Sequence, residues 1–227
     1  NPHLEYQQLV ARSLESTSNW LHGHWNKQSG VAHYTHGWNT GHQRNEGSKD
    51  WLVMCGTNGA ARVYIGGSGD PTNIANGQNL RAITNPSNLG INNGRYSEVS
   101  DFAVMEVITW SRALSDAEMK KSMAYLSAKL EAEDDGPPAS GMVAWFKSEE
   151  AGPTWPNSMG GDGASVLSGS VTRETDDGHG AEKPVSYVSG NTGAKISFGN
   201  VLPGTFSICS ISRHTGSNQK RILTSST

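Results

Sequence analysis

The stretch Asp50–Gly67, DWLVMCGTNGAARVYIGG, holds two short apolar runs separated by a turn sequence. Trp51–Cys55 and Arg62–Ile65 have the length and the apolar, β-branched or aromatic character of strands. The dipeptide Asn58-Gly59 between them is the strongest short-range signal for a hairpin turn. The stretch therefore predicts two antiparallel strands joined by a turn.

The rest of the chain repeats this pattern and contains one segment with helical periodicity. The further strands that we expect are Trp20–Trp25, Asp101–Trp110, Val143–Phe146, Val185–Val188, Ala194–Phe198 and Thr205–Ser212. A helix is expected over Ser115–Leu130, because Ser115 and Glu118 form a capping box and an apolar stripe follows them. Many short strands with one short helix predict an all-β sandwich or jelly roll.

The composition is that of a turn-rich, weakly charged protein. The chain has 227 residues, a formal net charge of −3, 17% charged residues, 27 glycines and seven tryptophans. It lacks the clustered lysine and arginine of a nucleic-acid-binding surface and the run of about 18 apolar residues of a membrane span. The composition favours an extracellular β-sandwich, so neither nucleic acid nor a membrane span is expected.

The two cysteines, Cys55 and Cys209, lie far apart in the sequence. One interpretation makes them two buried small apolar residues. The other makes them a disulfide, which the extracellular character of the chain favours because disulfides persist in oxidising compartments.

Three stretches carry a family likeness. In Asp50–Gly67 a tryptophan opens one strand, a short turn follows, and a tyrosine stands before a glycine in the return strand. Ser100–Met119, SDFAVMEVITWSRALSDAEM, runs from a strand through an Arg-Ala-Leu-Ser turn into a capped helix, and Gly141–Phe146 reads GMVAWF. These stretches resemble the central hairpin, the closing strand and helix, and the opening strand of laminin-G-like, concanavalin A-like domains. The segment NWLHGHW also resembles secreted tandem repeats of this kind from algae and other protists.

The resemblance implies a concanavalin A-like jelly roll whose parts occur in permuted order. Residues 1–136 resemble the late part of one repeat with its closing helix, and residues 137–227 resemble a linker and the early part of the next repeat. The boundary falls in Glu131–Ser140, EAEDDGPPAS, an acidic, proline-containing sequence that is typical of an exposed linker. The chain therefore resembles a window cut across a tandem array.

The two ends of the chain share a short sequence that agrees with such an array. Arg12–Ser18 reads RSLESTS and Arg221–Thr227 reads RILTSST, with identical residues at the first, third and fifth positions. The offset, 221 minus 12, is 209 residues, a plausible length for one sandwich. Residues 1–11 and 210–220 do not resemble each other, so any repeat is imperfect there.

Neither half can close a sandwich alone, because each would expose an apolar sheet face and unpaired strand edges. Two arrangements stay open: the halves fold together within one chain, or the late half completes the next copy and builds a head-to-tail filament. The resemblance places Cys55 and Cys209 in one region of the sandwich, so a bridge between them would join the two halves in either case.

The carboxylates do not form a catalytic pattern. Glu98, Asp101 and Glu106 do not fit the Glu-x-Asp-x-x-Glu run of glucanases with this fold, and the adjacent Glu149 and Glu150 would point apart on a strand. The chain is therefore not expected to be an enzyme.

Metal binding has weak support. His22 and His24 share a strand face and could chelate, but zinc takes a third and usually a fourth ligand, which the spacing does not identify. The resemblance makes Asp70 and Asp101 conceivable calcium ligands, although no loop is densely acidic. No cofactor is expected, and calcium stays open.

Glycan binding is a common use of the implied fold, since sugars stack on aromatic faces and bond to polar side chains. The glycan-binding candidates are Trp20, His22, His24, Trp25, Trp38 and Asn39. Strand alternation places Trp20 and Trp25 on opposite faces, so one of them is expected in the core.

The sequence favours a non-catalytic extracellular structural or adhesive protein. Its expected partners are copies of itself, and glycans are possible partners. The alternative is a carbohydrate-binding module of a larger secreted protein.

Overall fold

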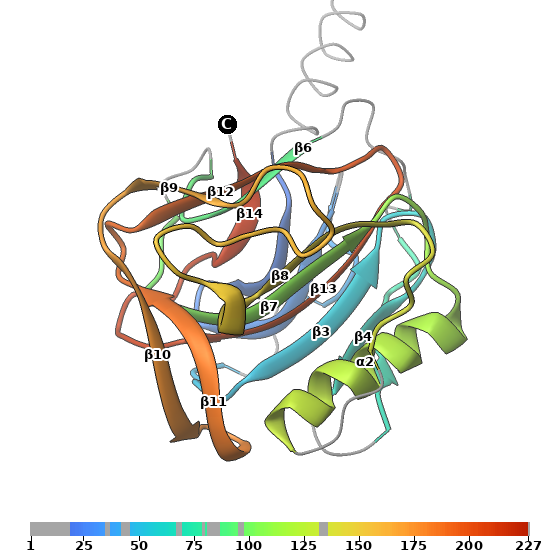
Figure 1. Ribbon diagram of the computed structural model, residues 1–227. Coiled ribbons are helices and arrows are strands. Elements are labelled where there is room, and N and C mark those ends of the chain that lie inside the picture. Colours follow the sequence, from blue (N-terminus) through green and yellow to red (C-terminus); the bar gives the residue numbers. More distant parts are fainter. Residues whose placement is uncertain are drawn as a thin grey trace, which may run out of the picture.

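The computed structural model describes residues 19–34, 37–41, 46–66, 70–78, 80, 87–94, 98–131 and 136–226. Over these residues the chain folds into two antiparallel β-sheets packed face to face, with an α-helix on the outer face of the larger sheet (Figure 1). The all-β sandwich predicted from the sequence is confirmed. The first copy of the terminal echo, residues 12–18, lies outside the described residues.

The two sheets have the following strands in spatial order. The six-stranded sheet contains β2 (Gln28–His33), β1 (Leu21–Trp25), β14 (Leu223–Ser226), β6 (Ser87–Ile91), β12 (Lys195–Leu202) and β9 (Ser165–Ser168). The eight-stranded sheet contains β10 (Val171–Gly178), β11 (Ala181–Gly190), β7 (Phe102–Trp110), β13 (Ser207–His214), β3 (Leu52–Thr57), β4 (Val63–Gly66) and β5 (Thr72–Asn73), and β8 (Met142–Lys147) also pairs with β7. A short 3₁₀ helix, η1 (Ser148–Glu150), follows β8.

The expected hairpin forms between β3 and β4, but its turn differs from the expected one. The backbone N–H of Thr57 donates to the carbonyl of Arg62 at 3.1 Å, which leaves residues 58–61 in the loop. Neither Asn58 nor Gly59 has a positive φ, as a tight two-residue turn would require. Asn58 instead accepts the backbone N–H of Phe206 at 2.9 Å, so its side chain fastens the hairpin to the connection before β13.

The helix α2 (Asp116–Leu130) begins where the sequence predicts. Ser115 accepts the backbone N–H of Glu118, and the Glu118 carboxylate accepts the backbone N–H of Ser115, which completes the capping box. Met119, Met123 and Leu126 are buried against the outer face of the eight-stranded sheet. This helix gives the sheet a second apolar core, separate from the core between the two sheets.

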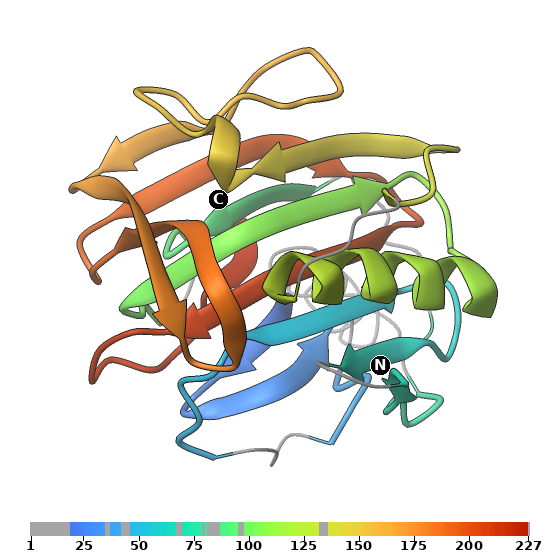
Figure 2. The same cartoon turned by 60° about the horizontal axis from the view of Figure 1, so that its bottom comes forward.

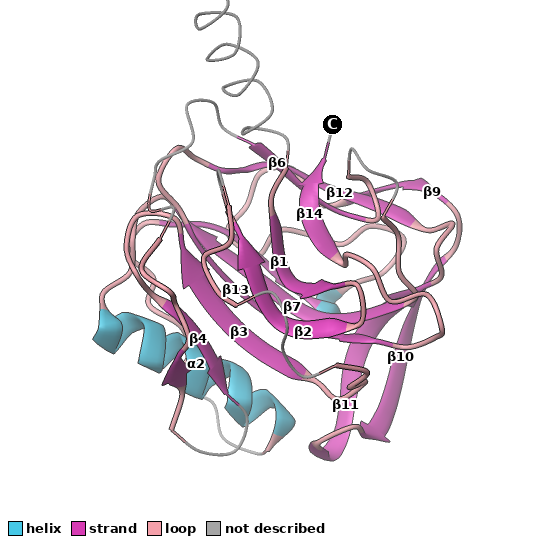
Figure 3. Cartoon of the chain, turned by 180° about the vertical axis from the view of Figure 1, so that it is seen from behind, coloured by secondary structure: helices cyan, strands magenta, loops and turns pink. Residues whose placement is uncertain are grey.

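Strands from the two segments on either side of the linker alternate in both sheets. β13 lies between β7 and β3, and β14 lies between β1 and β6 (Figure 2). Seen from behind, β14 lies alongside β1 and ends where β1 begins (Figure 3). Within this one chain, the two segments therefore complete each other's sheets.

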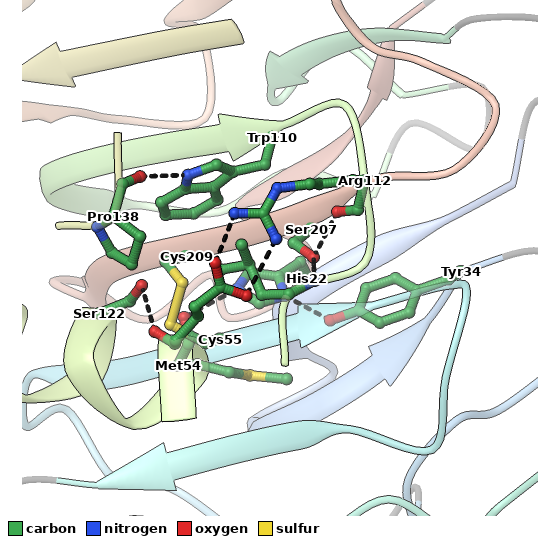
Figure 4. The surroundings of a disulfide bond; sticks show 12 residues. His22, Tyr34, Met54, Cys55, Trp110, Arg112, Ser122, Pro138, Ser207 and Cys209 are labelled. Carbon is green, nitrogen blue, oxygen red and sulfur yellow. Dashed lines mark hydrogen bonds and ion pairs between the residues drawn. A yellow bond between two sulfur atoms is a disulfide. The ribbon is translucent and has the colours of Figure 1, made fainter. Parts of the chain in front are cut away.

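A disulfide joins the same two segments. Cys55 of β3 and Cys209 of β13 lie directly opposite each other, with their Cα atoms 4.1 Å apart, and their sulfur atoms are bonded (Figure 4). Both residues are fully buried beneath α2. The disulfide interpretation of the two cysteines is confirmed, and the bridge spans 154 residues of sequence.

Candidate functional site

Three of the six glycan-binding candidates, in β1 and directly before it, lie inside the sandwich. Trp20 and His22 have no exposed surface, and His24 is 1% exposed. The Nε2 atom of His22 lies 3.3 Å from the carbonyl oxygen of Met54 and its Nδ1 atom lies 2.8 Å from the hydroxyl of Tyr34. Because a carbonyl only accepts, Nε2 carries the proton and Nδ1 accepts the tyrosine proton. These side chains lie in the interior and present almost no surface to solvent.

Burial keeps the interior histidines neutral. It lowers the pKa of His22 to about 3, and it lowers the pKa of His24 well below its usual value. The ring of His24 lies 4.6 Å from the ring of His214, whose pKa burial lowers to about 4. Among the described residues, no group of three or more histidine, cysteine, aspartate or glutamate side chains is placed to hold a metal.

Two other candidates, Trp25 and Trp38, meet on the surface of the six-stranded sheet. Trp25 ends β1, and Trp38 forms an isolated bridge to His33 at the end of β2. The two indole rings are 5.1 Å apart and tilted by 58°, and both side chains are half-buried. His33 meets the Trp38 ring edge-on at 5.5 Å. The structure thus brings together residues that the sequence separates by a loop.

The last candidate, Asn39, positions this pair and does not face solvent. It is 1% exposed, its backbone N–H donates to the carbonyl of Ala32 at 2.9 Å, and its side-chain oxygen accepts the backbone N–H of Tyr34 at 2.8 Å. These bonds turn the chain back after β2 so that Trp38 packs beside Trp25. Asn39 is therefore a positioning residue.

Charged and polar groups border the tryptophan pair. The Trp25 Nε1–H donates to the Glu98 carboxylate at 3.1 Å, and the same carboxylate forms an ion pair with Arg221. The Arg221 guanidinium also donates to the side-chain oxygen of Asn19 at 2.6 Å. Glu98 and Arg221 come from segments distant in sequence, so no spacing marks them. We call Trp25, Trp38, His33, Glu98 and Arg221 the tryptophan patch.

The tryptophan patch has the chemistry of a surface that binds polar ring compounds. Half-exposed indole faces offer apolar area at little loss of conformational freedom. The carboxylate of Glu98 and the guanidinium of Arg221 border the two indoles and bond to each other, and Arg221 is 9% exposed. The patch therefore combines two half-buried indole rings with a bordering ion pair.

Glu106, which was considered for catalysis, is a buried structural residue. It has no exposed surface, and its carboxylate accepts from the Tyr125 hydroxyl at 2.7 Å, from the Trp145 indole and from Lys129. Burial raises the pKa of Glu106, while Lys129 and the two other donors act in the opposite direction. This network fastens the end of α2 to β7 and β8, which lie on opposite sides of the linker.

Among the described residues, neither Asp70 nor Asp101 belongs to a group of three or more acids, histidines or cysteines that could hold a metal. Asp101 accepts from the backbone N–H of Asn218 at 3.0 Å and from the Asn218 side chain at 3.1 Å, so it fixes a loop after β13. Asp70 is exposed beside β5. Among the described residues, the structure therefore identifies no set of calcium ligands around either aspartate.

In the part of the chain that the structure describes, no helix is both long and apolar enough to span a membrane. No protein-family model, curated protein or solved structure matches the chain.

Proposed function

We propose that this sandwich is a laminin-G-like, concanavalin A-like unit of an extracellular structural or adhesive protein with repeated domains, and that it is not catalytic. The pairing of β14 with β1 is the observation that supports the repeated arrangement best. Leu21 pairs with Thr224 and His22 with Leu223. In a following repeat, the equivalent of Leu21 would stand 209 residues later, at position 230. That position comes six residues after Thr224, the residue with which Leu21 pairs. A short hairpin loop covers such a distance.

The register of β14 with β1 is the one that a hairpin between consecutive repeats would have. In an uninterrupted repeat, the sequence of β14 would run through a turn into the sequence of β1, and the two strands would pair as neighbours. Covalent linkage of units then gives an extended adhesive chain without any further interface. Association between copies would build filaments from such chains. The buried disulfide suits an oxidising, extracellular environment.

A rearranged chain tests the repeated arrangement. Residues 140–226 would be placed first and joined directly to residues 19–131, so that β14 precedes β1. We expect this chain to fold with the same circular dichroism spectrum and at least the same stability. The control is a second rearranged chain with the same residues, in which the new N- and C-termini interrupt β7. It should not fold, because β7 is a central strand of the larger sheet. Failure of the rearranged chain to fold would contradict the proposal.

Glycan binding is a second candidate function, and the tryptophan patch favours it. Binding to a panel of acidic and neutral polysaccharides can be measured by affinity electrophoresis and glycan arrays. We expect Trp38→Ala to weaken binding by about tenfold, because it removes one stacking face. Met159→Ala is the matched control, since Met159 is 45% exposed and lies in the loop between η1 and β9. No binding by the native chain, or equal loss in both variants, would refute a role for the patch.

A further inference from the structure

A cavity lies at the side of the sandwich where β9 and β10 follow each other. β9 is the outermost strand of the six-stranded sheet, and β10 is the outermost strand of the other sheet (Figure 1). The cavity has a volume of about 340 Å³, which falls within the range of small-molecule binding sites. It is lined by Ala151, Gly152, Pro153, Trp155, Ala164, Val166, Gly169, Ser170, Val171, Thr172, Arg173, Val188 and Ile196.

Part of the cavity lining is apolar and belongs to the core between the sheets. Trp155, Val188 and Ile196 are at most 5% exposed and belong to the core between the sheets. The Trp155 ring packs on Phe198 with 5.4 Å between ring centroids, and its Nε1–H donates to the carbonyl of Lys147 at 2.8 Å. The indole is therefore fixed in place and offers a formed apolar surface.

Arg173 is the charged side chain that lines this cavity. It lies opposite Val188 in the pairing of β10 with β11, so both side chains project from the inner face of the ribbon. Among the described residues, Arg173 has no ion-pair or hydrogen-bond partner. The neighbouring Glu174 projects from the other face, where it accepts from Ser189 at 2.6 Å and from Tyr187 at 3.1 Å. A guanidinium with no hydrogen-bond or ion-pair partner among the described residues thus lines the same cavity as the apolar side chains of Trp155, Val188 and Ile196.

We propose that this cavity binds a small organic carboxylate with an apolar body. A guanidinium matches a carboxylate through two parallel hydrogen bonds, whereas a neutral hydroxyl cannot form this pair. The apolar body packs on Trp155, Val188 and Ile196. Val166 is 49% exposed and stands on the β9 side of the opening, so it limits the width of the entrance. This site is separate from the tryptophan patch.

The test uses isothermal titration calorimetry of the full chain with octanoate and 3-phenylpropanoate. The neutral alcohols of the same size, octan-1-ol and 3-phenylpropan-1-ol, are the comparison ligands. Binding of either carboxylate at one site supports the proposal and identifies whether the apolar body is aliphatic or aromatic. We expect each alcohol to bind about tenfold or more weakly than the matching carboxylate, because it forms no charge-assisted bond.

Three variants locate the site. Arg173→Gln should lower carboxylate affinity by about tenfold or more, and Val166→Trp should abolish binding by filling the entrance. Both residues are exposed, so the fold is expected to persist, and circular dichroism checks this. Lys121→Gln removes the same charge from the exposed face of α2 and should leave affinity unchanged. Equal binding of acid and alcohol, unchanged affinity in Arg173→Gln, or association of copies through β9 without carboxylate binding would overturn the proposal.

Discussion

Removal of the disulfide with Cys55→Ala/Cys209→Ala tests how strongly the two segments depend on their covalent link. The bridge closes a loop of 154 residues, and the chain-entropy relation for a loop of that length gives about 5 kcal/mol. Native disulfides contribute about 2–5 kcal/mol in practice, and alanine also removes two buried sulfur atoms. We therefore expect the free energy of unfolding to fall by about 3–5 kcal/mol.

Urea denaturation, followed by circular dichroism and tryptophan fluorescence, measures this change, since the free energy of unfolding falls linearly with urea concentration. The single variants Cys55→Ala and Cys209→Ala are the controls, because loss of either partner breaks the bridge. Each single variant, and the native chain in reducing agent, should match the double variant within about 1 kcal/mol. A decrease of less than about 1 kcal/mol in the double variant would show that the bridge contributes little to the stability of the fold.

Three further changes are expected to alter stability. Burial lowers the pKa of His22 to about 3, that of His214 to about 4 and that of His24 well below 6.5, so the stability that depends on their neutral form is complete above pH 6.5 and is lost as the pH falls below it. Between pH 6.5 and about 4, urea denaturation at stepwise pH should show the free energy of unfolding falling by about 1.4 kcal/mol per pH unit for each histidine that stays neutral in the folded state. Gly56→Ala would place a methyl group onto the Tyr34 hydroxyl and should cost about 2 kcal/mol in the same assay. Lys129→Met leaves the buried carboxylate network without its cation and should cost about 3 kcal/mol at pH 7, whereas a change below about 1 kcal/mol would contradict the network's role.

The elements that could be predicted from sequence are those with strong local signals. The β3–β4 hairpin and α2 combine apolar runs with turn or capping residues, and both form. β9 and β10 were not predicted, because they are edge strands whose side chains face solvent and show no apolar alternation. β14 reads LTSS, and only the terminal echo marked it. Its identity as a strand depends on β1 and β6, which lie far away in the sequence.

The candidate site could be predicted only in part, for a similar reason. Trp25 and Trp38 were identified from sequence, but Glu98 and Arg221 join them only through the tertiary structure. His22 and His24 have the pattern of a polar strand face. Their burial arises from partners on other strands, and the pairing of β1 with β2 shifts between Gly23 and His24. A sequence pattern does not distinguish a polar surface from a hydrogen-bonded interior in such a case.

Strands from the two segments alternate in both sheets, and cleavage of the linker between the segments is the sharpest test of this arrangement. A protease site would be inserted between Gly136 and Pro137, and the cut chain would be examined by size-exclusion chromatography and circular dichroism in reducing agent. The interleaved sheets predict that the two fragments stay together at the size of one intact chain, with an unchanged spectrum. Separation into two independently folded fragments would contradict the account.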